Sequence, residues 1–229
     1  MSITPINSAN LTALTAAERM DKQYRYQRYV YDGSRKYYLW GRDTLLNEIS
    51  LEPQDTLLEI GCGTGRNLFQ LHERYPQHAL YGVDASQLML EQAQRRLTPQ
   101  SASTIHFKQG LAQELTLEQL GVQQAFDHIV FSYVLSMIPE WRLAFDHALT
   151  LLKPSGTLHL VDFADQSALP RWMQAALKQW LAWFQVHPDV QVPDYLQTVS
   201  LQSQGQLQMR YLWGRYALLA HYSPRSTCL

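Results

Sequence analysis

The feature that most constrains the fold is an apolar strand that leads directly into a glycine-rich turn. The segment from Thr56 to Gly65 reads Thr-Leu-Leu-Glu-Ile-Gly-Cys-Gly-Thr-Gly, so glycine stands at every second position from 61 to 65. Glycine tolerates positive φ angles and lets a ligand approach the backbone closely. At a strand-to-helix turn, this opens a ligand crevice at the carboxyl edge of a parallel sheet. We therefore expect an α/β protein with a binding loop at residues 61–65.

The pattern around this turn supports the same fold class. Apolar runs of strand length alternate with helical patterns, which is typical of βαβ units and a parallel sheet. We expect strands at 56–60, 80–83, 105–107, 128–133 and 157–163, with helices at 66–75, 86–97, 117–119 and 141–152 between them. Helices at 169–184 and 194–203 are expected to follow, and then a hairpin of 206–212 with 216–222. The sequence thus predicts a doubly wound, mostly parallel seven-stranded sheet with an antiparallel C-terminal hairpin.

Composition limits the function classes. The chain has 229 residues, of which 46% are hydrophobic and 17% charged, enough to bury one sizeable core. A net charge of −1 provides no global field for nucleic acid. Cys62 and Cys228 lie far apart and in no metal-ligand spacing, so we expect a reducing compartment and neither a disulfide scaffold nor a metal. No signal peptide or membrane-spanning run is expected, which predicts a cytoplasmic protein.

The spacing beyond the turn discriminates between cofactors. Asp84 ends the second expected strand, 19 residues beyond Gly65, where its carboxylate can accept both hydroxyls of a ribose. The dinucleotide pattern is G-x-G-x-x-G, whereas here the third glycine comes one residue early. A nicotinamide-dependent dehydrogenase is therefore disfavoured. A cofactor-binding scaffold without activity of its own is a further alternative, which the intact loop with Asp84 makes improbable.

The segment from 56 to 84 resembles motif I and the following acidic motif of the class I S-adenosylmethionine-dependent methyltransferases. The resemblance implies S-adenosylmethionine as the cofactor and an α/β fold of the methyltransferase kind. It also implies a cofactor site made of Glu59, Gly61, Cys62, Gly63, Gly65, Asp84, Ala85, Gly110 and Leu111. In that set the glycines line the methionine moiety and the ribose, Glu59 lies near the amino group, Asp84 holds the ribose and Ala85 lies against the adenine.

The chain departs from that pattern after the third strand. Many relatives carry an aspartate there that receives the adenine amino group, whereas this chain has Leu111. A backbone carbonyl, Gln109 or Gln113 is left to bind that amino group.

The N-terminal segment suggests an acceptor. It carries the rings of Tyr24, Tyr26, Tyr29, Tyr31, Tyr37, Tyr38 and Trp40, interleaved with arginine and lysine. Aromatic faces hold cationic amines at roughly 0.5–2 kcal/mol per ring, and arginine binds carboxylates. We expect residues 1–50 to be a tail and an aromatic helical lid, and residues 51–229 to be the catalytic core of one domain.

The same segment, with Tyr24-Arg-Tyr-Gln-Arg28-Tyr-Val-Tyr31-Asp32 and Gly41-Arg42-Asp43, is similar to the opening of bacterial betaine-lipid N-methyltransferases. These enzymes convert diacylglyceryl-homoserine into its trimethyl form. The resemblance covers about residues 18–222. It implies a lipid or small-molecule amine acceptor held by Tyr24, Arg28, Arg35, Tyr38 and Arg42, with Tyr133, Ser132 and Tyr31 at the reacting atoms. A quinone C- or O-methyltransferase and a phosphatidylethanolamine N-methyltransferase remain alternatives.

The segment 169–184 bears on membrane contact. Leu169, Trp172, Met173, Leu177, Trp180 and Leu181 make a wide apolar face, with Arg171 and Lys178 beside it. Trp-rich amphipathic helices can lie at a bilayer interface. A helix that covers the acceptor cleft, or an interface between copies, explains the same pattern. Peripheral contact with the inner membrane face is therefore a hypothesis, and no nucleic-acid partner is expected.

Overall fold

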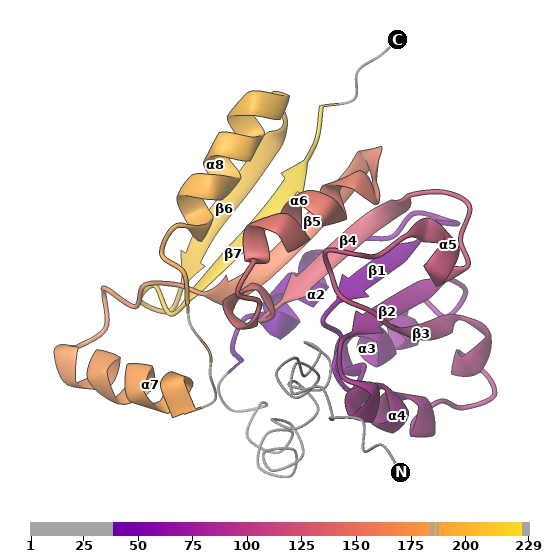
Figure 1. Cartoon of the computed structure of the whole chain (residues 1–229), viewed down its shortest axis with the longest axis horizontal. Coiled ribbons are helices and arrows are strands. Elements are labelled where there is room, and N and C mark those ends of the chain that lie inside the picture. The colour runs from indigo at the N-terminus through magenta and orange to yellow at the C-terminus, as the bar shows by residue number, and fades with distance from the viewer. Residues whose placement is uncertain (1–38, 184–185, 187, 226–229) are drawn as a thin grey trace, which may run out of the picture.

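A seven-stranded sheet with the order β3-β2-β1-β4-β5-β7-β6 organises the chain. The computed structural model describes residues 39–183, 186 and 188–225 (Figure 1). The strands are β1 (Leu57–Ile60), β2 (Leu80–Asp84), β3 (Ile105–Gln109), β4 (Phe126–Ser132), β5 (Leu152–Phe163), β6 (Gln206–Leu212) and β7 (Ala217–Ser223). The pairs among β1 to β5 are parallel, and β7 runs antiparallel between β5 and β6. This confirms the predicted doubly wound sheet and its terminal hairpin.

Helices cover both faces of the sheet. On one face lie α2 (Arg42–Glu48), α3 (Arg66–Arg74) and α4 (Gln87–Arg95), whose apolar residues share one buried cluster. The opposite face is covered by α5 (Leu117–Leu120), α6 (Trp141–Thr150) and α8 (Val192–Ser203). Short 3-10 helices, η2 (Ser101–Ser103) and η3 (Leu135–Met137), lie in the connections. The remaining helix, α7 (Arg171–Trp183), contributes Leu181 to the first cluster but lies at one end of the molecule (Figure 1).

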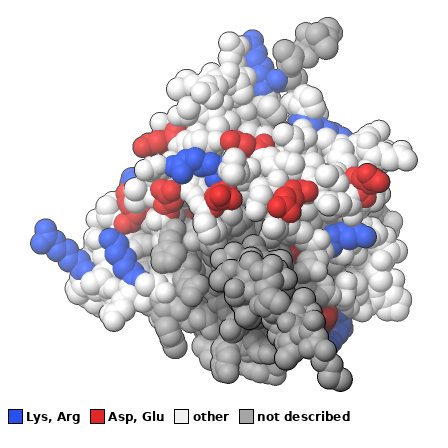
Figure 2. Space-filling model, in the orientation of Figure 1, with Lys and Arg blue, Asp and Glu red and all other residues white. Residues whose placement is uncertain are grey.

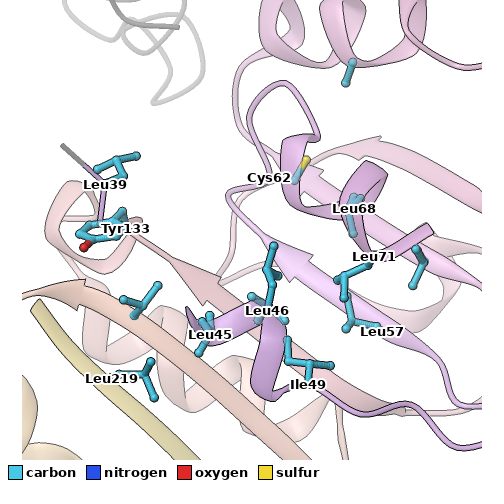
Figure 3. Close-up of a cluster of buried hydrophobic side chains, with 14 of the residues drawn as sticks. Leu39, Leu45, Leu46, Ile49, Leu57, Cys62, Leu68, Leu71, Tyr133 and Leu219 are labelled. Atoms are coloured by element: carbon cyan, nitrogen blue, oxygen red, sulfur yellow. The ribbon is translucent and has the colours of Figure 1, made fainter. Parts of the chain in front are cut away.

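The helix α2 is positioned by one apolar face. Leu45, Leu46 and Ile49 are buried, and Arg42 is buried on the same side because residues three, four and seven apart share a helix face. Figure 3 shows Leu45, Leu46 and Ile49 among side chains from the sheet, with Tyr133 near Leu39. Packing of α2 therefore carries Arg42 toward the carboxyl ends of the strands.

The strand β5 begins earlier than the sequence predicts. It starts at Leu152 instead of Thr157, and α6 correspondingly ends at Thr150. Phe126 pairs with Leu152, and the register then shifts so that His128 pairs with Thr157. Such an irregularity accommodates Pro154, which lacks a backbone donor. Residues 153–156, which lay between the expected helix and strand, are thus part of an irregular strand.

None of the helices in the described ranges is long and apolar enough to cross a bilayer. Basic and acidic side chains are interspersed over the face shown in Figure 2, in keeping with the small net charge.

Candidate functional site

The glycine turn between β1 and α3 has a left-handed backbone packed against its neighbours. Gly61, Gly63 and Gly65 have φ angles of 72°, 54° and 73°. A Cβ atom on Gly61 would lie 2.2 Å from Cγ2 of Val134, and one on Gly65 would lie 2.6 Å from Cζ of Phe107. Both the backbone angle and the available space therefore require glycine at these two positions.

Asp84 is held in place by this turn. The backbone N–H of Gly63 donates to its Oδ2 at 2.7 Å, and that of Ser86 donates to its Oδ1 at 2.9 Å. The carboxyl is almost fully buried at the end of β2. A carboxylate oxygen has more than one acceptor site, so Asp84 retains capacity for ligand hydroxyls.

A mainly apolar cavity of about 120 Å³ opens beside Asp84. Its lining includes Ala85, Gly110, Leu111 and Gln113, which come from the loops after β2 and β3. Gln109 does not line it and instead donates from Nε2 to the carbonyl of Ala85 at 3.0 Å. The shape and chemistry suit a flat, largely apolar ring with a sugar attached to it. Residues predicted from separate motifs thus meet at one cavity.

A second, polar cavity of about 480 Å³ lies on the other side of Gly61, which lines both. Its walls include the predicted site residues Glu59, Cys62, Arg42 and Ser132. Further lining comes from Leu39, Thr64, Arg66, Asn67, Gln70 and Arg96. A guanidinium and a carboxylate in one chamber suit a ligand with ammonium and carboxylate groups.

Within this second cavity, Glu59 is fixed by its neighbours. Asn67 Nδ2 donates to Glu59 Oε1 at 2.6 Å, and both side chains are buried. The buried Oγ of Ser132 has no hydrogen-bond partner in the described part of the chain. Because buried polar atoms are normally paired, Ser132 is suited to bind a ligand group.

Tyr133, directly after β4, has an unusual backbone and a buried ring. Its φ is 56°, and its hydroxyl donates to the carbonyl of Trp40. Burial raises the pKa of Tyr133 well above its ordinary value, with Tyr216 and Asp162 adding to the effect and Arg42 opposing it. At neutral pH, Tyr133 is therefore a protonated donor that positions the chain at Trp40, and its phenol is poorly suited to act as a base.

Several aromatic rings meet around Tyr133, and we call Trp40, Tyr133, Phe163, Trp213 and Tyr216 the aromatic cluster. Ring centroids lie 4.6 Å apart for Tyr133 and Phe163, and 5.2 Å apart for Trp40 and Tyr216. Trp40 and Trp213 remain about half exposed, at 50% and 49%. The sequence did not mark the last three members as site residues, because only the pairing of β4 with β5 and of β5 with β7 brings them to Tyr133.

Asp162, near the end of β5, is another residue that sequence reasoning missed. It accepts hydrogen bonds from the backbone N–H groups of Ser136 and Phe163 at 3.1 Å and 2.7 Å. Burial raises its pKa to about 6, although these hydrogen bonds act in the opposite direction. Asp162 therefore ties η3 to β5, behind the cavity wall formed by Val134 and Met137.

The remaining predicted residues, Tyr24, Arg28, Tyr31, Arg35 and Tyr38, lie outside the described residues. In the part of the chain that the structure covers, no group of three or more histidine, cysteine, aspartate or glutamate side chains can hold a metal ion.

Comparison with protein families and with individual sequences shows which family the chain resembles. The model of a family described as "Methyltransferase domain" matches residues 51–212. Trans-aconitate 2-methyltransferase of Escherichia coli O1:K1 / APEC is 31% identical over 147 residues, which are 63% of this chain and 52% of the relative. The same enzyme of Shigella flexneri is 29% identical over the same shares. The chain thus spans about half the length of the curated relatives it matches.

Solved structures share the fold. The plantazolicin methyltransferase BpumL, in complex with a triazolic desmethylPZN analogue and SAH, superposes with a TM-score of 0.69 at 12% identity, over 90% of this chain and 93% of that one. The DhpI-SAM-HEP complex has a TM-score of 0.63 at 17% identity, over 93% of this chain and all of that one.

Proposed function

The chain belongs to the class I S-adenosylmethionine-dependent methyltransferases, and on that premise we propose that it N-methylates an acceptor carrying both an amine and a carboxylate. The acceptor proposed is the head group of diacylglyceryl-homoserine, converted in successive steps to the trimethyl betaine lipid. We propose that this takes place in the cytoplasm, at the inner membrane face.

The paired cavities support the cofactor assignment. Asp84 beside the apolar cavity suits a ribose and an adenine, and Glu59 in the polar cavity suits the amino group of S-adenosylmethionine. Gly61 lines both cavities, so a ligand can pass from one to the other over bare backbone. When bound, S-adenosylmethionine supplies an electrophilic methyl group on its sulfonium.

The observation that carries the acceptor proposal is the aromatic cluster next to a buried arginine. Tyr133 lines the apolar cavity and lies close enough to Arg42 for the guanidinium to act on its pKa. A cationic amine over aromatic faces gains roughly 0.5–2 kcal/mol per ring, and a guanidinium is the best partner for a carboxylate. The described residues therefore offer aromatic faces to the amine of the head group and a guanidinium to its carboxylate. The tyrosines of residues 1–38 are proposed to complete this site as a lid.

The role left to the protein is positional. Each transfer is a displacement in which the acceptor nitrogen attacks the methyl carbon as the carbon–sulfur bond breaks, and the product ammonium loses a proton before the next transfer. Because its pKa is raised, the Tyr133 hydroxyl stays protonated at neutral pH and is not available as a base. We therefore assign the proton to water. Alignment of the reactants and exclusion of water are then the main contributions of the site.

The test is a product analysis with the full chain. Diacylglyceryl-homoserine in detergent micelles and methyl-labelled S-adenosylmethionine should give lipid products heavier by one, two and three methyl groups. A matched reaction with Arg42→Gln should lose activity, whereas Arg142→Gln, on the surface of α6, should retain it. If the full chain binds the cofactor but leaves this lipid unmethylated, the acceptor proposal is wrong.

A second candidate is O-methylation of a small polycarboxylic acid. It is favoured by the trans-aconitate methyltransferases among the relatives, and by Arg42, Arg66 and Arg96 around one cavity. A methyl ester is cleaved by mild base with release of labelled methanol, whereas a quaternary amine is stable. Incubation with trans-aconitate followed by base treatment therefore separates the two candidates.

A further inference from the structure

Three histidines form a continuous hydrogen-bonded chain across the sheet. His128 on β4 bonds through Nδ1 to Nε2 of His159 on β5 at 2.9 Å, and His159 Nδ1 contacts Nδ1 of His221 on β7 at 2.8 Å. Each end finishes on a carboxylate: His128 Nε2 lies 3.1 Å from Asp55 Oδ2, and His221 Nε2 lies 2.9 Å from Glu48 Oε2. We call these five side chains the histidine chain.

The histidine chain lies away from the cavities. His128 pairs with Leu57, the first residue of β1, whereas the glycine turn follows Ile60 at the other end of that strand. Glu48 is the last residue of α2 and Arg42 is the first, so about 9 Å of helix separates the chain from the polar cavity. The cofactor site therefore does not account for it.

Counting protons shows that neutral histidines cannot make all of these contacts. Four contacts require four protons, because an ionised carboxylate only accepts and each nitrogen pair needs one hydrogen between its members. Three neutral imidazoles carry only three protons. If both outer nitrogens donate to Asp55 and Glu48, one of the two nitrogen pairs is left with lone pairs facing each other across 2.8–2.9 Å. This count does not depend on which tautomers are assigned.

The surroundings favour an extra proton on an outer ring. His159 is 4% exposed, and its burial, with His128 and His221 on either side, keeps its pKa well below the ordinary value. Glu48 also binds Arg210 of β6; burial acts to raise its pKa, but Arg210 and His221 hold it lower, so it stays ionised. Asp127, next to His128, is paired with Lys153 at 2.8 Å. Asp55 thus remains to balance one imidazolium, and Glu48 is shared between Arg210 and His221.

We infer that the histidine chain stores one proton at neutral pH, as an imidazolium shared between its outer rings, and so clamps α2 to the sheet. Proton transfer along the two nitrogen pairs converts the form charged at His128 into the form charged at His221. Either form satisfies all four contacts. When the proton is lost, one contact becomes repulsive and the bond between Glu48 and the sheet weakens.

Nitrogen NMR of the full chain labelled with ¹⁵N-histidine tests the count directly. At pH 7, four of the six ring nitrogens of His128, His159 and His221 should carry protons. The single variants His128→Gln, His159→Gln and His221→Gln assign the signals. Finding only three protonated nitrogens would overturn the inference, and this result needs neither cofactor nor acceptor.

Urea unfolding provides a second readout. Well above pH 6.5 the unfolded histidines are neutral, so the folded chain then binds one proton more than the unfolded chain. Its stability should fall as pH rises in that range until the proton is lost, with the unfolding constant rising up to tenfold per pH unit. His159→Gln should lose this dependence, since its amide offers two N–H donors to the flanking rings. His72→Gln, which alters a histidine on α3 outside the chain, is the matched control. Parallel pH curves for all three proteins would contradict the proposal.

Discussion

Gly61 is the residue at which the two cavities meet, and no other residue type fits there. Its φ of 72° is nearly the same as the 73° of Gly121, which caps α5 with nothing within 4 Å of its missing Cβ. The two glycines therefore share the backbone requirement and differ only in the space around them. This difference allows the cost of the close approach to Val134 to be measured.

We expect Gly61→Ala to lower the free energy of unfolding by about 1–3 kcal/mol more than Gly121→Ala, because only the first forces a methyl group into Val134. Urea denaturation of both variants gives the difference. Gly61→Ala should also weaken cofactor binding, since the added methyl group narrows the passage between the cavities. Equal losses of stability would show that backbone strain alone fixes this glycine.

Asp84→Asn should weaken binding of S-adenosylhomocysteine by roughly 100-fold, about 3 kcal/mol, through the loss of charge-assisted hydrogen bonds to the ribose. Isothermal calorimetry measures this loss. Glu91→Gln removes a carboxylate from the surface of α4 and should leave the affinity unchanged. If Asp84→Asn binds S-adenosylhomocysteine with unchanged affinity, Asp84 does not bind the ribose.

The sequence could predict the site residues that are brought together by their spacing along a short segment of the chain. The glycine turn and Asp84 stand at fixed distances along one βαβ unit, so the spacing alone brings them together. His159 and His221 carry no such signal. They become neighbours only through the register of β5 with β7, and a one-residue slip would separate them. The same holds for Tyr216 in the aromatic cluster.

At the scale of elements, η3 depends on a buried carboxylate. Asp162 is inside the protein and accepts a hydrogen bond from the backbone N–H of Ser136, while the nearby Asp165 is only partly buried and receives two hydrogen bonds from Arg215 at 2.8 Å and 2.6 Å. Burial raises the first pKa, and the guanidinium lowers the second. The two aspartates should therefore give stability a pH dependence of opposite sign.

For Asp162, the folded pKa of about 6 lies above the unfolded value of about 3.9. Its contribution should be full below pH 4 and lost as pH rises through 6, by at most about 3 kcal/mol. Asp162→Asn should remove that slope from urea unfolding curves recorded between pH 4 and 7. Asp165→Asn should instead remove stability that is present above pH 4 and lost as pH falls further. If the two variants change the pH dependence of stability in the same direction, burial does not raise the pKa of Asp162.

The elements were predictable where the apolar pattern was periodic, and less so where a local signal competed with pairing. The hairpin is an example, since residues 206–212 and 216–222 were expected to pair across a short turn. The strand β5 was expected only from residue 157, but pairing with β4 extends it back to Leu152, through Pro154 and Gly156. The backbone donor that proline lacks is tolerated there because the register is already irregular.

At the scale of the whole molecule, α7 presents an apolar surface with basic neighbours. Trp172 is 73% exposed and Met173 is 38% exposed, with Arg171 and Lys178 on the same helix. Basic side chains extend from the edge of Figure 2 at which Figure 1 shows α7. Such a surface can insert its indole into a bilayer interface while its cations meet anionic lipids.

We expect the full chain to co-sediment with liposomes that contain anionic lipid, and Trp172→Glu to lower the bound fraction by roughly tenfold. Leu201 on α8 is equally apolar and 80% exposed, so Leu201→Glu is the control for general surface charge. Equal losses in both variants, or no binding by the unaltered protein, would contradict membrane contact by α7 and favour the alternatives, a helix that covers the acceptor site or an interface between copies.

The strand order has a consequence for how such a protein diversifies. With β1 and β4 at the centre, β1 to β3 support Asp84 and its apolar cavity, while β5 to β7 support most of the aromatic cluster. On the proposed acceptor site, mutations in the second half should change which acceptor is methylated without disturbing the methyl donor. A chimera that carries β5 to β7 of a relative should take the acceptor of that relative and still bind S-adenosylmethionine. Acceptor specificity can then evolve in one half of the sheet while the other half keeps the cofactor site.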